Sequence, residues 1–385
     1  MEWYTRAQAR ANPLTLTGAE ADALLATVTD RIDRVTVRYI KLMGEHIRDI
    51  GKLTASDVHR LQQFTRMNVN MNVVRRQLSI AANISAEELE KIYEKAALTD
   101  IRMARDILGI HGAADMETNL AYRSIIRAQA QETAAAMHNL SNTTVVSQYY
   151  SNAIDECVFA VQNGVEDYNT AIRRVVRQAG NAGLKIVEYE SGYRRRVDTA
   201  ARMNVLDGMR HLNQSIMEEV GREFGADGVE ISAHMLCAED HLPYQGRQFS
   251  NEDFEEIQST LARPFGEWNC RHSWHPIMLG ISPRRYTDQQ LREYRDFSTD
   301  SIEIEGREKS RYEWSQEMRR CETAVRQAKD CANLAATTGD MTLRRQCQTK
   351  INSLEDYYYT ITTETGLPAE ERRMSVPGFR KVKAG

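Results

Sequence analysis

A long proline-free stretch is the feature that most restricts how this chain can fold. Only 7 of the 385 residues are proline, and none lies between Pro13 and Pro243. Proline interrupts helices and is frequent in the turns of loop-rich β proteins, so its absence over such a length favours long helices. We therefore expect a mainly α protein, with enough residues for two or three ordinary domains.

Composition and charge exclude several classes of protein. Hydrophobic residues make up 42% of the chain and charged residues 27%, which is typical of globular rather than disordered sequences. The 50 basic and 54 acidic side chains leave a net charge of −4. The chain as a whole is therefore not a polycation suited to coating nucleic acid or an acidic lipid surface.

The sequence contains neither a signal peptide nor a membrane-spanning segment. The first residues lack an apolar core, and no stretch reaches the roughly 18 uncharged apolar residues needed to cross a bilayer. The 6 cysteines are scattered along the chain and are expected to be reduced thiols. We expect a soluble protein made in the cytoplasm.

Residues 1–225 carry the patterns of a helical body. Thr17 to Glu20 and Ser85 to Glu88 match the capping box, in which two side chains satisfy the first free amides of a helix. Apolar residues follow each box at spacings of three and four. Further helices are expected over 116–138, 142–163, 166–180 and 191–224.

Residues 226–285 differ from the body and predict a small α+β module. Residues 229–234 alternate apolar and polar side chains like a short strand, and residues 244–249 resemble a turn that leads into another strand. A short helix is expected from Ser250 to Leu261. The loop from Pro264 to Pro283 follows, and the region from 243 to 283 holds four of the prolines.

The remaining residues predict a C-terminal helical hairpin over 286–366, built from long helices at 305–337 and 341–364. A basic tail, 367–385, follows and is expected to be mobile unless a partner holds it. It is the main candidate for contact with nucleic acid or an acidic partner, through Arg372, Arg373, Arg380, Lys381 and Lys383.

The central module concentrates side chains that bind metals. Imidazole and thiolate are the ligands that Zn²⁺ prefers, and structural zinc usually takes two ligands from each of two short clusters. The two clusters here contain His234, Cys237 and His241, then Cys270, His272 and His275. The competing interpretation is structural: the cysteines are small buried hydrophobic residues, and the histidines bond to loop backbone.

A third interpretation of the same residues is a nucleophilic site. Cys237 with His241, or Cys270 with His272, oriented by Asp240 or Glu239, contains the residue types of such a site. The sequence lacks a phosphate-binding P-loop, a dinucleotide fingerprint, a zincin motif and a nucleophile elbow. The run of arginines at 194–196, expected on a helix, suits either phosphate binding or ion pairing between helices.

Several segments resemble the phage minor capsid protein 2 family, which is related to the Mu F-like head morphogenesis proteins. The resemblance covers about 195–285, with helical surroundings that are compatible over nearly the whole length. It is carried by residues 195–205, 225–234, 237–249, 268–272 and 280–283.

The resemblance implies a structural protein, not an enzyme: a low-copy component of the phage head near the portal, acting in head assembly and in genome packaging or delivery. It implies a hetero-oligomeric assembly with portal protein, major capsid protein or both, and contact with packaged DNA. It also implies a place in the virion, and in the host cytoplasm during assembly. The Mu F-like group carries a Cys/His-rich motif, in which His272 here replaces the last cysteine, so a structural zinc remains compatible. The alternative is a zinc-dependent enzyme or toxin-like protein acting through the Cys/His module, although the residues after Pro283 leave no room for an appended enzyme.

Overall fold

The structure is a computed structural model that describes residues 18–50, 83–110, 119–142, 173–178, 187–188, 194–267 and 270–382, and a few single positions between 73 and 81 and at 170. The described part is mainly α, as predicted. Thr17, the expected helix 142–163, most of 166–180, Trp268, Asn269 and Lys383 lie outside the described residues.

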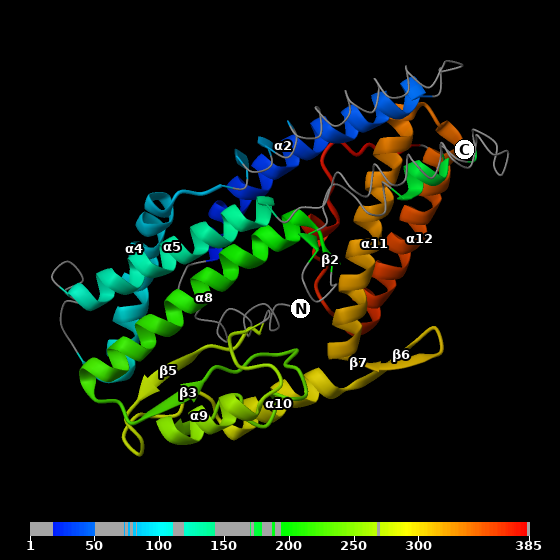
Figure 1. Ribbon diagram of the computed structural model, residues 1–385. Helices are drawn as coiled ribbons and strands as arrows, with labels where there is room; N and C mark the ends of the chain where they lie inside the picture. Colours follow the sequence, from blue (N-terminus) through cyan, green and yellow to red (C-terminus); the bar gives the residue numbers. More distant parts are fainter. Residues whose placement is uncertain are drawn as a thin grey trace.

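Three helices form one layer of the molecule: α4 (Ala86–Ile107), α5 (Leu120–Asn142) and α8 (Val197–Phe224) (Figure 1). The predicted capping box starts α4, because the Ser85 hydroxyl accepts from the amide of Glu88 at 3.1 Å. Where the three helices meet, the hydroxyls of Tyr93 and Thr133 lie 3.0 Å apart. Gly208 of α8 faces both of these side chains, so the helices approach closely at this point.

The C-terminal helices α11 (Arg311–Thr338) and α12 (Met341–Thr365) form the predicted hairpin, and Gly339 ends α11 in a left-handed conformation with φ of 82°. Helix α2 (Gly18–Ile50) contacts both α8 and α11 and so joins the layer to the hairpin (Figure 1). Gly44 of α2 lies directly against the side chain of Thr337, where a larger residue would collide. One hydrophobic core consequently runs from α2 through α12.

The central module contains a three-stranded antiparallel sheet in the order β4-β3-β5. The strands are β3 (Gly228–Ile231), β4 (Gln248–Ser250) and β5 (Trp274–Ile277), and helix α9 (Asn251–Thr260) packs on the sheet. Strand β5, which packs against α8, lies inside the segment expected to be a loop. It had been missed because Pro276 argues against a strand, yet β5 is an edge strand, where a missing amide is tolerated.

A second segment was predicted wrongly between the module and the hairpin. Helix α10 (Asp288–Thr299) is followed by a β-hairpin of β6 (Ser301–Ile304) and β7 (Arg307–Ser310), where the start of a long helix had been expected. Glu305 and Gly306 form its turn with φ of 51° and 73°. Glycine supplies such a turn at little cost, and charge-rich composition had hidden the signal.

The arginine run is also not helical. Arg194 and Arg195 form β2, which pairs with β1 (Val187–Glu188), and Glu188 lies opposite Arg194. Arg196 has an extended backbone, so α8 begins at Val197 and not at 191. The first two arginines of the run thus belong to a short strand and not to a helix.

The tail is folded, which corrects the expectation that it is mobile. After a short 3₁₀ helix, η1 (Glu371–Met374), residues up to 382 run along the hairpin. Met374 and Val376 are buried. The Lys329 ammonium donates to the carbonyl of Met374 at 3.1 Å, and the Asn333 amide donates to that of Pro377 at 3.1 Å.

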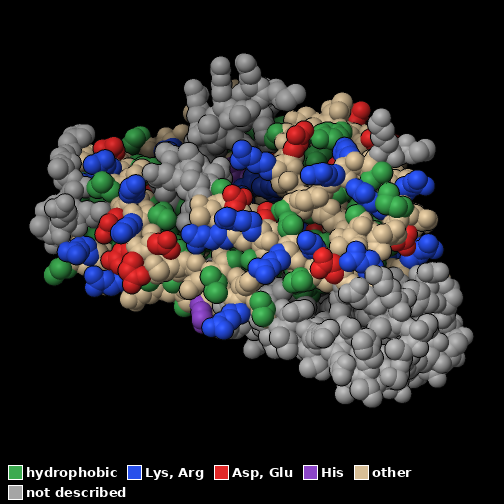
Figure 2. All heavy atoms as spheres, turned by 90° about the horizontal axis from the view of Figure 1, so that it is seen from above, with side chains coloured by type: hydrophobic (Ala, Val, Ile, Leu, Met, Phe, Trp, Pro, Cys, Tyr) green, Lys and Arg blue, Asp and Glu red, His purple; other side chains and the backbone are tan. Residues whose placement is uncertain are grey.

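On the face shown in Figure 2, basic side chains are interspersed with acidic ones and exposed hydrophobic side chains are scattered. Among the helices that the structure describes, none is long and apolar enough to cross a membrane.

Candidate metal centre

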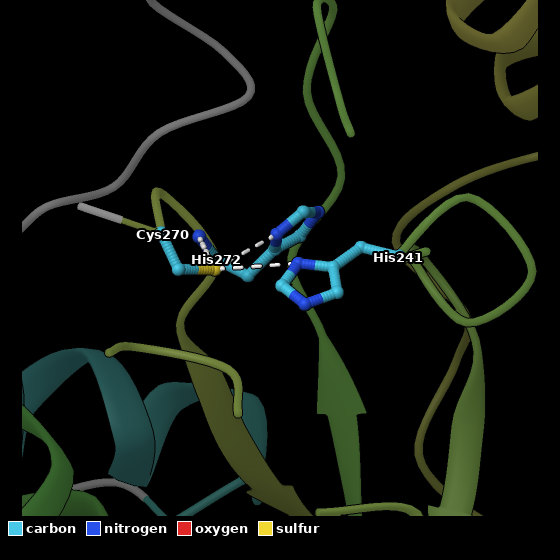
Figure 3. A group of neighbouring side chains, drawn as sticks. All are labelled: His241, Cys270 and His272. Atoms are coloured by element: carbon cyan, nitrogen blue, oxygen red, sulfur yellow. Dashed lines mark hydrogen bonds between the residues drawn. The ribbon is translucent and has the colours of Figure 1, made fainter. Parts of the chain in front are cut away.

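Three of the predicted ligands meet in the interior of the module. His241 comes from the loop after β3, whereas Cys270 and His272 come from the segment that leads into β5 (Figure 3). One ligand atom from each residue lies within 4.8 Å of the other two, and all three side chains are buried. The fold therefore brings together one member of the first sequence cluster and two of the second.

The distances in this trio fit a tetrahedral ion. The Cys270 Sγ lies 3.5 Å from Nδ1 of His241 and 3.3 Å from Nδ1 of His272. Tetrahedral zinc bonds of about 2.3 Å to sulfur and about 2.0 Å to nitrogen place the two ligand atoms ~3.5 Å apart. The three donors can thus share one zinc ion with little movement.

Hydrogen bonds to the backbone orient the imidazole of His241. Its Nε2 lies 2.8 Å from the carbonyl oxygen of Arg263, which assigns the proton to Nε2 and leaves the lone pair of Nδ1 facing Cys270. Metal-binding histidines characteristically donate their second ring N–H to a carbonyl or carboxylate in this way. The arrangement matches a ligand held ready for an ion.

Two more predicted ligands border the trio. The Cys237 Sγ lies 3.6 Å from Nε2 of His272, on the opposite side of that ring from Cys270. The His234 ring lies against the His272 ring, with centroids 4.3 Å apart. His234 bonds through Nδ1 to the carbonyl of Met235 at 2.8 Å, and its buried Nε2 has no hydrogen-bond partner.

The sixth predicted ligand, His275, belongs to another environment. Successive side chains of a strand point to opposite faces, and His275 of β5 is paired with Glu230 of β3. Its Nε2 lies 3.9 Å from a carboxylate oxygen of Glu230. His275 thus lies outside the cluster formed by the other five residues.

Burial sets the protonation of the whole cluster. It raises the pKa of both Cys237 and Cys270, and it lowers the pKa of His234 to about 4 and that of His272 well below its ordinary value. In the absence of an ion the thiols are neutral and the imidazoles uncharged. A reactive cysteine needs a depressed pKa and access, so this geometry does not favour the nucleophilic interpretation.

Gln245 is a residue of the cluster that the sequence did not single out. Its buried side-chain oxygen accepts from the amide of His234 at 3.1 Å and lies 3.4 Å from Nε2 of His272. The one sequence signal for this hydrogen-bonding role is that Gln245 precedes Gly246 in the turn before β4. The cluster also has an aromatic wall, since the Phe265 ring lies 4.4 Å from the ring of His241.

The basic residues of the tail lie apart from the module, along the helical hairpin. Lys381 bonds to Glu355 at 2.9 Å, and Arg373 is half-buried near Glu322 and Glu370. Burial lowers the pKa of Arg373 to about 10. Arg372 and Arg380 are exposed, and Lys383 lies outside the described residues.

Comparison with known protein families identifies the family of this chain. No curated protein and no solved structure matches the chain. The family model described as phage minor capsid protein 2 matches residues 24–358, which include the helical body, the Cys/His cluster and most of the hairpin. The match covers most of the chain and agrees with the resemblance seen in the sequence. The chain therefore belongs to the phage minor capsid protein 2 family, and is a structural protein of the phage virion.

Proposed function

We propose that the protein is a low-copy component of the phage head that binds the portal protein, and acts in head assembly and in genome packaging or delivery. The observation that carries the proposal is the family match over 24–358. The continuous core from α2 to α12 supports it, because such a core lets the molecule act as one rigid link between neighbours.

Co-expression with the portal protein tests this role. We expect the two proteins to copurify and the complex to persist through gel filtration, whereas the major capsid protein alone should bring down less of the chain. The protein should also appear at the portal vertex in an asymmetric reconstruction of the particle. Failure to copurify, together with density elsewhere in the shell, would refute the portal assignment.

We also infer that His241, Cys270 and His272 hold a structural zinc ion, with the fourth position filled by water, because Cys237 lies at the other ring nitrogen of His272. The ion would supply no chemistry other than cross-linking the loop after β3 to the segment before β5. The module has a small core of its own, with six buried residues, so such a link would add much to its stability.

Metal analysis of the purified protein tests the zinc proposal. We expect a single zinc ion per chain and, after exchange for Co²⁺, the absorption of a tetrahedral site with sulfur ligation. Cys270→Ser and His241→Asn should lose the ion, whereas Cys347→Ser, at a buried free cysteine of α12, should retain it. Protein that is folded but metal-free, or variants that keep the ion, would contradict the assignment.

A further inference from the structure

A pocket lined by arginines lies next to the Cys/His cluster, and Gln245 of that cluster forms part of its lining. Its volume is about 580 Å³. It lies between the turn before β4, the segment after β5 and helix α10. The lining contains Arg247, Arg284, Arg292, Arg295, Leu242 and Leu291.

The pocket carries more positive charge than its own carboxylates neutralise. Arg284 bonds to Asp288 at 2.6 Å, and Arg295 bonds to Asp296 at 3.0 Å. Arg247 and Arg292 are exposed and have no side-chain hydrogen bond or ion pair with another described residue. Two guanidinium groups are therefore available at one concave site, and guanidinium forks bind carboxylates and phosphates in bidentate fashion.

The arginines also converge on one point of the pocket. Arg284 lowers the pKa of the Asp288 carboxyl, with smaller contributions from Arg292 and Arg247. All three cations thus act on the same carboxylate. A ligand anion entering beside Asp288 would meet the same set of charges.

Part of the wall is apolar. Leu242 and Leu291 are half-buried and contribute side chains to the lining. Gly246, with φ of 69°, lies directly against Leu291, so the turn leaves no space for another side chain there. Gln248, another lining residue, donates its side-chain amide to the carbonyl of Ser282. Ile281, which precedes Ser282 in the chain, is 78% exposed.

This combination favours a protein ligand over nucleic acid. A DNA duplex presents a convex, uniformly anionic backbone and gains nothing from leucines at a pocket wall or from an exposed isoleucine beside it. Protein interfaces, in contrast, are enriched in arginine and bury apolar anchors in pockets.

We propose that this pocket binds an acidic segment of a partner protein, with carboxylates on Arg247 and Arg292 and an apolar side chain against Leu242 and Leu291. The arginines require a segment with acidic side chains. The leucines favour a segment that also carries an apolar side chain between the acidic ones. The proposal concerns the surface itself and does not depend on which virion protein is the neighbour.

Fluorescence anisotropy on the full chain tests the proposal. The probe is a short labelled peptide in which glutamates alternate with leucines, and it is compared with one in which glutamine replaces glutamate and one in which serine replaces leucine. We expect the first peptide to bind most tightly. The double variant Arg247→Gln/Arg292→Gln should weaken it about tenfold, since both substitutions remove unpaired charges.

The matched control is Arg320→Gln, which removes an exposed arginine of α11 far from the pocket along the chain. It should leave the affinity for the peptide unchanged. Equal binding of all three peptides, or an equal affinity in the double variant, would overturn the proposal. Tighter binding of a labelled DNA duplex than of the peptide, lost in the double variant, would also overturn it and identify a nucleic-acid site instead.

Discussion

Arg196 and Asp330 form an ion pair of 2.8 Å that joins the start of α8 to the middle of α11. Both side chains are nearly buried, with 10% and 4% of their surfaces exposed. The pair connects the helical layer to the C-terminal hairpin, two parts of the chain that the sequence presents as separate segments. Because both charges are nearly buried, this ion pair offsets part of the free-energy cost of withdrawing each of them from water.

Removing one partner of this pair should therefore destabilise the protein strongly. Asp330→Ala leaves the arginine charge buried and should lower the free energy of unfolding by about 3–5 kcal/mol. Asp296→Ala removes an ion pair on α10 whose carboxylate is 59% exposed, so its cost should stay below about 1 kcal/mol. Urea denaturation followed by circular dichroism measures the free energy of unfolding of both variants. An equal loss of stability in the two would contradict a stabilising role for the buried ion pair of Asp330.

The close approach of α4, α5 and α8 makes a second prediction. In an open helix, Gly→Ala stabilises by about 1 kcal/mol, but at Gly208 the added methyl group would meet the hydroxyls of Thr133 and Tyr93. Gly208→Ala should instead lower the melting temperature, at a cost of about 1–3 kcal/mol. Adding Thr133→Ala makes room, so the double variant should lose less than the sum of the single losses.

The buried histidines predict loss of stability in mild acid. Burial lowers the pKa of His275 to about 3 and that of His234 to about 4, and it lowers the pKa of His272 well below 6.5. As the pH falls below about 6.5 the unfolded chain binds protons that the native one does not, so stability falls by up to ~1.4 kcal/mol per pH unit for each histidine.

One neighbouring group acts in the opposite direction. Burial raises the pKa of Glu230, so between its ordinary and its raised value the native protein binds the proton first and is stabilised as the pH falls. Burial also raises the pKa of Asp207 and of Glu218, which act in the same direction as Glu230. Burial lowers the pKa of four histidines, because His241 joins the other three, so the net effect remains destabilising. Unfolding free energies measured with a chelator at neutral and mildly acidic pH check this, and His275→Asn should flatten the profile. An unchanged profile would refute the neutral, buried state of His275.

Deleting the tail should damage the fold. Because Met374 and Val376 are buried and Lys329 donates to the Met374 carbonyl, removing residues 374–385 exposes the hairpin core and leaves the buried Lys329 ammonium with Glu355 but without this acceptor. We expect a lower melting temperature by differential scanning calorimetry. Lys381→Gln, which removes only an exposed partner of Glu355, should change it little. A deletion without effect would show that the tail contacts add no stability.

DNA contact by the tail is therefore better tested by substitution. Arg372→Gln/Arg380→Gln removes the two exposed charges and leaves the buried contacts in place. If the tail touches packaged DNA, the double variant should bind a DNA duplex more weakly. A plot of the logarithm of its DNA-binding constant against the logarithm of the salt concentration should have a slope smaller in magnitude by about 2. Identical salt slopes for variant and parent would exclude this contact.

The sequence predicted the elements whose signals are local. Capping boxes, helical spacing and a terminal glycine are short-range features, which is why the start of α4, the end of α11 and both ends of α12 were predicted closely. Strand β5 and the β6–β7 hairpin were missed because partners, not propensity, decide whether short segments become strands. The same holds for the tail, whose order depends on Lys329 and Asn333 far back in the chain.

In the candidate site, too, the local signals could be predicted from the sequence and the contacts between distant segments could not. Residue type and clustering were enough to nominate the six ligands, and five of them do gather around His272. The sequence could not separate His275 from the others, because that depends on the register of β5 against β3, which places His275 beside Glu230. Nor could it reveal the pocket arginines as a group, since Arg247 and Arg292 meet only through the packing of α10 beside the turn before β4.

The contact between α2 and α11 has a consequence for biosynthesis. Helix α2 leaves the ribosome early, but α11, against which Gly44 packs at Thr337, is made only after the layer and the central module. Until then the part of α2 around Gly44 lacks the helix that covers it in the folded protein. Contacts so distant in sequence form slowly. The nascent chain therefore completes its core only after α11 has been made, and chaperones that shield apolar helices should bind it until α11 emerges.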